Sequence, residues 1–552
     1  MNQPNKDIQK IEMAGNVLVL GGGLTGIRTA SAIAAQGYSV SLIEAGEAVG
    51  LAAESRPLNG FSQTEKEALN KLVEQARSSE HIEILEKTAV AHAAGVAGNY
   101  RVLLSGQAEP IEKHVGAIVV ASEFMREPLN ASYGLEIGGA VITQSDLEQI
   151  LASETKKFAG KTVAFVVGFG QSGNPLVMER VLRSALELAQ IDDTSVYIYV
   201  HDLKVASAGL SMLASQTRDR GVIFFKLDNA PLIKLNNGGV SITYNDFVIQ
   251  EDINLQADIL VMEEAIKPDY ANTRLADILG IDIREEGFLQ SDNVHRYPVA
   301  TNREGIYVVG GSRQVQTLDQ ALIDAENAAL EVRRLLGDGT VLVPANKAVL
   351  DTGKCTFCLT CFRCCPHGAI YWDLDRKPII SPIACQGCGI CASECPMDAI
   401  QIGEFNDTTI REQVHGCIAD TAGKAPKIVA FCCQNSAMEA AQMAGEFGIT
   451  LPDGLRLVQV PCAGKIDLDY ILNAFVAGAD GVLVLACHPG NCKSEHGNTY
   501  ARWRVTDAQR RLCEVGLDHT RLRFATLASN MAIDFERILT EFETRLKDLS
   551  EG

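Results

Sequence analysis

The chain has 552 residues, of which 47% are hydrophobic and 21% charged, and this balance predicts several folded domains and excludes a largely disordered protein. The formal net charge of −20 argues against a nucleic-acid partner, because phosphate contacts need clustered Lys and Arg. No apolar run approaches the ~20 residues that span a bilayer, and the first residues lack the basic-then-apolar pattern of a signal peptide. We therefore expect a cytoplasmic protein that reaches a membrane only through a partner.

The first predicted strand runs into a glycine-rich turn with the spacing G-x-G-x-x-G, formed by Gly21, Gly23 and Gly26. An Ala-rich helix follows the turn, and the next predicted strand ends at Glu44. This order is typical of a dinucleotide-binding fold, in which a pyrophosphate rests on the helix N-terminus and an acid accepts from ribose hydroxyls. The pattern predicts an FAD site; the alternative is a purely structural glycine turn.

A second copy of the turn follows a strand at 162–167, with glycines at Gly168, Gly170 and Gly173. Two such units in one chain are the layout of flavoproteins that hold FAD in one fold and a nicotinamide in the other. The second strand of this copy ends at Val200 without a clear acid after it, with His201 and Asp202 as the candidates, and no arginine pair marks a 2′-phosphate. NAD(P) binding here is left open against a fold retained without its ligand.

A third segment returns to the first fold: a strand at 305–309 leads into Gly310 and Gly311, and an amphipathic helix is predicted over 318–335. In two-dinucleotide flavoproteins this strand and helix close over the flavin, where the helix N-terminus suits the negative charge of the reduced ring. We expect Gly310 and Gly311 to lie against the FAD. Ser312 stands where an acid is usual.

All 16 cysteines lie between Cys355 and Cys513, which is not the distribution of a disulfide scaffold. Two runs of C-x2-C-x2-C-x3-C-P follow each other, as in bacterial two-cluster ferredoxins, where the fourth cysteine of each run binds the other cluster. The spacing predicts two 4Fe–4S clusters. The first is assigned to Cys355, Cys358, Cys361 and Cys395, and the second to Cys385, Cys388, Cys391 and Cys365.

The last part of the chain alternates predicted strands and helices, which indicates a doubly wound parallel sheet. Ligands of such sheets bind outside the carboxyl ends of the strands, and cysteines stand at three consecutive strand ends. These are Cys432, Cys433, Cys462, Cys487 and Cys492. We expect four of these five thiols to bind a 2Fe–2S centre; zinc, or buried cysteines without a ligand, are the alternatives.

These motifs carry a resemblance to known families. The front with its two cysteine runs, including the tracts 141–151 and 279–311, resembles the flavin-bearing A-type subunit of heterodisulfide reductase. The back, with Phe431-Cys-Cys433, Pro461-Cys-Ala-Gly464 and Ala486-Cys-His-Pro-Gly-Asn-Cys492, is similar to the delta subunit of methyl-viologen-reducing hydrogenase. A similar fusion occurs in the B-type subunit of the quinone-interacting membrane-bound oxidoreductase. The flavoprotein part, before Cys355, lacks the extra cysteines that the heterodisulfide reductase family usually has there. The resemblance therefore implies flavin-mediated electron transfer more than electron bifurcation.

The expected fold class is α/β multidomain. The expected parts are a FAD-binding two-dinucleotide fold over 1–345 with its second unit at about 156–275, a two-cluster ferredoxin domain over 346–405, a linker over 406–425, and a delta-subunit-like iron–sulfur domain over 426–552.

The expected function is that of an oxidoreductase: an iron–sulfur flavoprotein subunit of a heterodisulfide-reductase-like complex, with no catalytic side chain of its own. It would pass electrons between FAD, the clusters and partner subunits, together with a redox donor or acceptor of hydrogenase, formate dehydrogenase or reductase type. The alternatives are a self-sufficient NAD(P)H:ferredoxin-type oxidoreductase and a non-enzymatic iron–sulfur sensor or scaffold.

Overall fold

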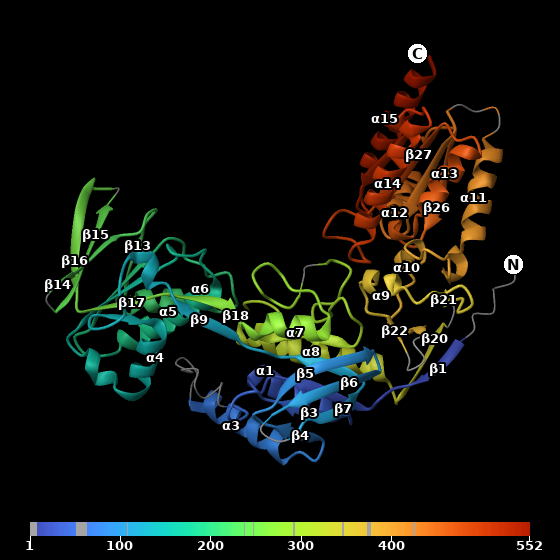
Figure 1. Cartoon of the computed structure of the whole chain (residues 1–552). Coiled ribbons are helices and arrows are strands. Elements are labelled where there is room, and N and C mark those ends of the chain that lie inside the picture. The colour runs from blue at the N-terminus through green and yellow to red at the C-terminus, as the bar shows by residue number, and fades with distance from the viewer. Residues whose placement is uncertain are drawn as a thin grey trace.

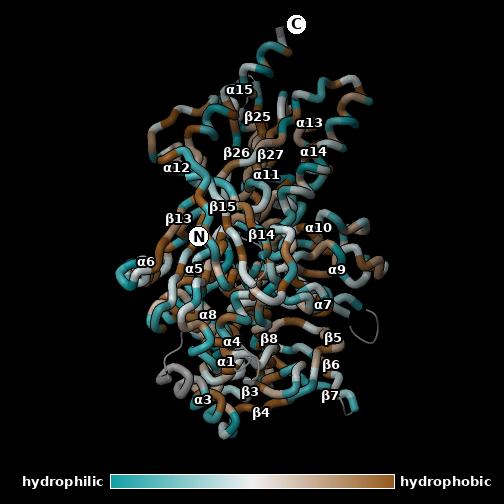
Figure 2. Tube along the Cα trace, turned by 90° about the vertical axis from the view of Figure 1, so that its left-hand side faces the viewer, coloured by the Kyte–Doolittle hydropathy of each residue, from teal (hydrophilic) through white to brown (hydrophobic). Residues whose placement is uncertain are grey.

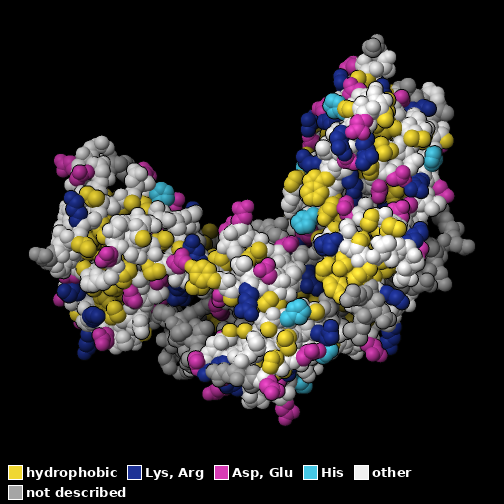
Figure 3. Space-filling model, viewed as in Figure 1, with side chains coloured by type: hydrophobic (Ala, Val, Ile, Leu, Met, Phe, Trp, Pro, Cys, Tyr) yellow, Lys and Arg dark blue, Asp and Glu magenta, His cyan; other side chains and the backbone are white. Residues whose placement is uncertain are grey.

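Two α/β units lie side by side, and a small cysteine-rich unit connects them to a C-terminal α/β unit that rises at one end (Figure 1). The computed structural model describes residues 8–50, 63–106, 109–236, 238–246, 248–290, 293–344, 347–372, 377–421, 423 and 426–551. The boundary expected between residues 345 and 346 lies outside these ranges. A wide hollow separates the second α/β unit from the C-terminal unit (Figure 3).

The first unit is a five-stranded parallel sheet between two layers. Its strand order is β19 (Ile306–Val308), β8 (Ala117–Val120), β2 (Asn16–Leu20), β3 (Ser39–Ile43) and β4 (Ile82–Leu85). Alternate strand residues pack on helices α1 (Leu24–Ala34), α3 (Gln63–Ser78) and α8 (Leu318–Leu336). The other face packs on β5 (Ala89–Val96), β6 (Asn99–Ser105), β7 (Ile111–Val115) and α7 (Ala271–Leu279). Strand β1 (Ile8–Glu12) pairs with β20 (Thr340–Pro344).

The second unit repeats this plan. Its parallel sheet has the order β10 (Val141–Thr143), β17 (Ile259–Met262), β11 (Thr162–Val167), β12 (Ser195–Val200) and β13 (Ile223–Lys226). Helices α4 (Gln144–Ser153), α5 (Pro175–Leu188) and α6 (Leu210–Asp219) cover one face. Strands β14 (Leu232–Asn236), β15 (Gly239–Asp246) and β16 (Glu251–Ala257) cover the other. The antiparallel pair β9 (Phe124–Pro128) and β18 (Glu264–Pro268) joins the two units (Figure 1).

The cysteine-rich unit has two similar halves. Short strands pair as β21 (Val349–Leu350) with β24 (Ile400–Gln401), and as β22 (Ile370–Trp372) with β23 (Pro378–Ile380). Each half carries one short helix, α9 (Thr360–Cys364) or α10 (Ile390–Ser393). This symmetry repeats the symmetry of the two cysteine runs.

The C-terminal unit is a parallel sheet of β26 (Leu455–Val460), β25 (Ile428–Cys433), β27 (Gly481–Ala486) and β28 (Leu522–Thr526). Helices α11 (Asp407–Asp420), α13 (Leu468–Val476) and α14 (Gly497–Glu514) lie on one face. Helices α12 (Ala437–Glu446) and α15 (Ala532–Glu551) lie on the other. Strand β27 is hydrophobic and buried along its length (Figure 2). The 3₁₀ turns of the chain are η1 (Asn130–Tyr133), η2 (Thr155–Phe158), η3 (Gly310–Ser312), η4 (Gly403–Phe405), η5 (Ala463–Lys465) and η6 (His519–Arg521).

The structure differs from the sequence expectation at the linker 406–425, because α11 occupies most of it. Ile410, Val414 and Ile418 stand four residues apart, so they form one apolar stripe that packs on the C-terminal sheet. These residues therefore belong to the C-terminal unit. Among the described residues, no helix is long and apolar enough to cross a membrane.

Candidate cofactor sites

The first glycine turn joins β2 to α1. The backbone packs so closely around Gly21 and Gly26 that neither position has space for a side chain. A Cβ on Gly26 would stand 1.8 Å from the carbonyl oxygen of Gly21, and a Cβ on Gly21 would stand 2.4 Å from that of Ala121. Gly21 also has a φ of +112°, a conformation that favours glycine. Helix α1 begins at Leu24, directly after Gly23, so its N-terminus faces the turn as an anion site requires.

Two carboxylates border this turn. Glu44 accepts hydrogen bonds from the backbone N–H groups of Gly22 and Gly46, both at 2.6 Å, which holds it at the end of β3 beside the turn. Glu123 lies over Gly23, where a Cβ would stand 2.3 Å from its Oε1. An anion that approaches Gly23 must displace the flexible end of Glu123. The glycine cradle and Glu44 fit a dinucleotide once that side chain has moved.

Gly310 and Gly311 lie beside the first turn, and a Cβ on Gly311 would stand 2.8 Å from the backbone nitrogen of Phe124. Gly310 has a φ of +61°, and a Cβ there would stand 2.8 Å from the Thr25 side chain at the start of α1. Its N–H donates to Asp324 of α8 at 3.2 Å, and Asp324 also pairs with Arg313 at 2.9 Å. Asp324 is a buried acid beside the turn that sequence reasoning missed, because it is 12 residues beyond Ser312, where an acid was sought.

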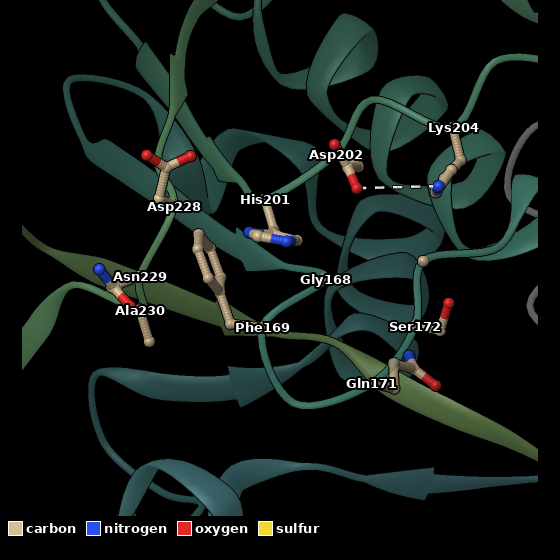
Figure 4. Close-up of a pocket in the computed structure, with 11 residues that line it drawn as sticks. Gly168, Phe169, Gln171, Ser172, His201, Asp202, Lys204, Asp228, Asn229 and Ala230 are labelled. Atoms are coloured by element: carbon tan, nitrogen blue, oxygen red, sulfur yellow. Dashed lines mark ion pairs between the residues drawn. The ribbon is translucent and has the colours of Figure 1, made fainter.

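The second glycine turn borders a pocket of about 430 Å³ (Figure 4). The rings of Phe169 and His201 lie near its centre, with centroids 5.7 Å apart. Asp202, at the end of β12, pairs with Lys204 at 3.7 Å. His201 and Asp202, the two residues that the sequence offered in place of a ribose-binding acid, both line this pocket.

In the cysteine-rich unit the thiols of each predicted set lie near one another, and Cys364, which belongs to neither set, lies beside the second. Burial raises the pKa of Cys361, and three neighbouring thiols raise it further: Cys358, Cys395 and Cys355. Burial likewise raises the pKa of Cys391, and further contributions come from Cys388, Cys365, Cys385 and Cys364. The fourth member of each set thus comes from the other run. Cys358 is exposed, whereas Cys385, Cys388 and Cys391 are buried.

In the C-terminal unit four thiols form a closed ring. Sγ of Cys433 lies 3.6 Å from Sγ of Cys487. The thiols of Cys433 and Cys462, of Cys462 and Cys492, and of Cys492 and Cys487 also influence one another's pKa, so they are neighbours. Contacts with Cys433 and Cys492 lower the pKa of Cys487. A Cβ on Gly497, the first residue of α14, would stand 2.2 Å from Sγ of Cys462, so only glycine lets this helix approach the thiols.

Cys432 is not part of this ring, although the strand-end argument expected five converging thiols. Successive strand residues point to opposite faces of a sheet. Cys433 therefore faces the ring, while Cys432 is buried on the opposite face in the core under α12 and α15. Cys432 could join the ring as a ligand only if β25 were shifted by one residue, so that its side chains exchanged faces.

The thiol ring lies directly against the cysteine-rich unit. A Cβ on Gly464 would stand 2.5 Å from the side chain of Ile390, and one on Gly389 would stand 2.7 Å from that of Lys465. Ser393 donates to the carbonyl oxygen of Lys465 at 2.7 Å. Cys388, Cys391 and the four ring cysteines share one hydrophobic core.

The first α/β unit contacts both cysteine regions. Asn302 donates to the carbonyl oxygen of Pro366 at 3.0 Å, next to Cys365. Asn293 donates to the carbonyl oxygen of Cys492 at 2.9 Å. The ion pair of Arg296 with Glu495, at 2.5 Å, is less than a tenth exposed on both sides. The segment that contains these residues is where the three regions meet.

Among the described residues, no group of three or more His, Cys, Asp or Glu side chains is arranged to hold a metal ion. The fit of the thiols to clusters rests on donor chemistry instead. Soft thiolates are the ligands that iron–sulfur clusters take, and inorganic sulfide and several irons separate the thiolates of one cluster.

Family models match three segments. Residues 428–550 match methyl-viologen-reducing hydrogenase, delta subunit; residues 19–70 match an NAD(P)-binding Rossmann-like domain; and residues 378–401 match a 4Fe-4S binding domain. Together with the sheets described above, these matches confirm the predicted α/β multidomain class.

Relatives match the two parts of the chain separately. The chain is 26% identical over 468 residues to the A-type subunit of ferredoxin:CoB-CoM heterodisulfide reductase from Methanosarcina mazei, covering 80% of this chain and 58% of that protein. It is 33% identical over 124 residues to the D-type iron-sulfur subunit of F420-non-reducing hydrogenase from Archaeoglobus profundus, covering 22% of this chain and 90% of that protein. Thioredoxin reductase of T. acidophilum aligns at 17% identity and a TM-score of 0.41, over 58% of this chain and 97% of that one.

The chain spans less than three fifths of the length of its heterodisulfide reductase relatives from Methanosarcina. Its C-terminal unit, by contrast, spans nearly all of the hydrogenase iron-sulfur protein. Through residues 428–550 the chain therefore belongs to the methyl-viologen-reducing hydrogenase delta subunit family, and it joins this domain to a front like the A-type subunit of heterodisulfide reductase.

Proposed function

We propose that the chain is an electron-transfer iron–sulfur flavoprotein, an oxidoreductase subunit of a heterodisulfide-reductase-like complex. FAD lies on the first glycine turn, with contacts from Gly21, Gly23, Gly26, Glu44, Gly310 and Gly311. Two 4Fe–4S clusters take the two cysteine sets of the ferredoxin domain. A 2Fe–2S centre takes the ring of Cys433, Cys462, Cys487 and Cys492. When bound, FAD accepts electrons as a pair and releases them singly.

The observation that carries this proposal is the hydrophobic core that Cys388 and Cys391 of the second set, and Cys361 of the first, share with the C-terminal ring. Electron tunnelling falls steeply with distance, so two adjacent clusters in one apolar core form a relay. The segment of Asn293 and Asn302 brings the flavoprotein part to both. Partners are other subunits of the heterodisulfide-reductase kind and a redox donor or acceptor protein, since the relatives are named as subunits of such assemblies.

The test compares two neighbouring cysteines in anaerobically prepared full-length protein. Two cubanes and one 2Fe–2S centre require about ten irons per chain. Cys462→Ala should lose about two irons and the 2Fe–2S signal in EPR spectra, with FAD retained. Cys432→Ala is the matched control, since Cys432 faces away from the ring, and it should keep all the iron. About eight irons in the unmodified chain, or equal iron loss in both variants, would contradict the assignment.

A further inference from the structure

The two glycine turns have the same spacing but differ in structure. In the first, helix α1 begins at Leu24, directly after Gly23. In the second, the position equivalent to Leu24 is Gln171, yet α5 begins only at Pro175. Proline has no N–H group, and the residue before it disfavours the helical conformation, so the helix cannot start nearer the turn. The helix N-terminus that would receive a pyrophosphate is therefore displaced.

The first N–H groups of α5 are also partly used. Asn174 caps this helix, and its side chain accepts from the N–H of Val177 at 2.9 Å. With the N–H of Pro175 missing as well, two of the donors that attract anions to helix N-termini are absent or satisfied.

Two backbone N–H groups of the turn, those of Gly168 and Gly170, and the side-chain amide of Gln171 donate to Glu263, which follows β17 and is 1% exposed. The N–H of Gly170 also donates to the Tyr133 hydroxyl oxygen at 3.1 Å. Oε2 of Glu263 accepts from the N–H of Gly168 at 2.9 Å and from the Gln171 amide at 3.2 Å. Its Oε1 accepts from the Tyr133 hydroxyl at 3.0 Å and from the N–H of Gly170 at 3.3 Å. A carboxylate offers about four acceptor sites, and all four have donors here. The buried Glu263 carboxylate therefore has no acceptor site left for a further donor.

The neighbouring pocket does not offer a substitute site. The Phe169 ring stands beside His201, between the glycine turn and the end of β12, where a dinucleotide fold places the ribose (Figure 4). Lys204 is the one Lys or Arg among the residues that line the pocket, and it pairs with Asp202. Asp228 adds a second acid to the lining. Lys226, beside the pocket, also pairs with Asp202, at 3.9 Å. A phosphate in this pocket would therefore face two acids and a lysine that is already paired.

We propose that Glu263 is a built-in occupant of the second glycine turn, standing in the place of a nucleotide pyrophosphate, so that this unit binds no NAD(P). A second anion against the same amides would have to displace a carboxylate held by four hydrogen bonds. Electrons then reach the chain through the flavin or the cysteine sets, and not from a nicotinamide bound to this unit. This holds whichever cofactors the rest of the chain takes.

The first test measures nucleotide binding to the full-length holoprotein. Equilibrium dialysis with NADH, NADPH and ADP-ribose should show no saturable binding up to millimolar concentration. Saturable binding of any of the three that is lost in Gly170→Val would overturn the proposal.

The second test measures hydrogen exchange of the peptide that contains Gly168 and Gly170. Glu263→Gln keeps the size of the side chain but loses acceptor capacity, so exchange at this peptide should accelerate at least tenfold. Glu264→Gln is the matched control, because the Glu264 carboxylate pairs with Arg180 and Ser145 and not with the turn, and exchange should stay within threefold. Unchanged exchange in Glu263→Gln, or equal acceleration in both variants, would show that Glu263 does not hold the turn.

Discussion

Lys465 provides a sharp test of how helices α11 and α13 are held together within the C-terminal unit. Its side chain is 1% exposed, and Nζ lies 2.8 Å from Oδ1 of Asp407 at the start of α11. It also donates to the hydroxyl of Tyr470 on α13. We consider Lys465→Met, because methionine keeps an unbranched stem that can pack against Gly389. The variant leaves a partly buried carboxylate without its cation.

The size of the effect follows from the pKa of Asp407. Burial alone would raise this pKa, but hydrogen bonds from Lys465, Tyr470 and Gln401 lower it to about 2 from an ordinary 3.8. A carboxyl whose folded pKa is depressed adds stability that is fully present above its ordinary value and is lost as the pH falls towards 2. The difference corresponds to about 2.5 kcal/mol and is shared by the three donors. Because Tyr470 and Gln401 remain in the variant and Asp407 is 24% exposed, we assign about 1.5 kcal/mol to Lys465.

Hydrogen exchange of the full-length chain at pH 7 measures this effect locally. A loss of about 1.5 kcal/mol should accelerate exchange in α11 and α13 by about tenfold. Arg411→Met is the matched control: Arg411 also joins α11 to α13, through Asp469, but it is 48% exposed, and its removal should change exchange by less than threefold. Equal exchange rates in α11 and α13 of the two variants would refute the argument that burial determines how much an ion pair contributes to stability.

Two further predictions address the flavin site and the domain junction. Gly26→Ala should yield chains without FAD, because its Cβ would overlap the Gly21 carbonyl oxygen; a full complement of FAD released per chain would contradict the cradle. Arg296→Met should lower the free energy of unfolding by about 3 kcal/mol, because Glu495 keeps a buried charge without its closest partner. Arg296→Met/Glu495→Gln should recover more than half of that loss in chemical unfolding, and strict additivity of the two single variants would show that the pair is not coupled.

The grouping of the cysteines was accessible from sequence because it depends on short-range spacing. Each ferredoxin set contains three thiols from one run, and the known crossing of the fourth cysteine places Cys365 and Cys395. The C-terminal ring needed one further step. Strand alternation separates Cys432 from Cys433, but which of the two faces the ring depends on which helices cover each face of the sheet. A single sequence does not contain that information.

The second glycine turn shows a different limit. Pro175 is a local signal, and it already indicates that α5 cannot begin as α1 does. Glu263 is 95 residues from Gly168 along the chain, so its position in the turn follows only from the pairing of β17 beside β11. The prediction of a linker over 406–425 was wrong for a simpler reason. Ile410, Val414 and Ile418 repeat with a helical period that is visible in the sequence and was overlooked.

The contacts between regions also determine which experiments can separate their functions. Removal of residues 426–552 would expose Ile390, which is fully buried against η5, and would leave Arg296 without Glu495. Such a truncated chain would lose core contacts of Cys361, Cys388 and Cys391 together with the C-terminal ring, because these thiols share one core with it. A loss of electron transfer in it would then not distinguish a missing relay from a damaged ferredoxin domain. Point substitution of Cys462, compared with Cys432, removes one thiol while leaving these surfaces in place.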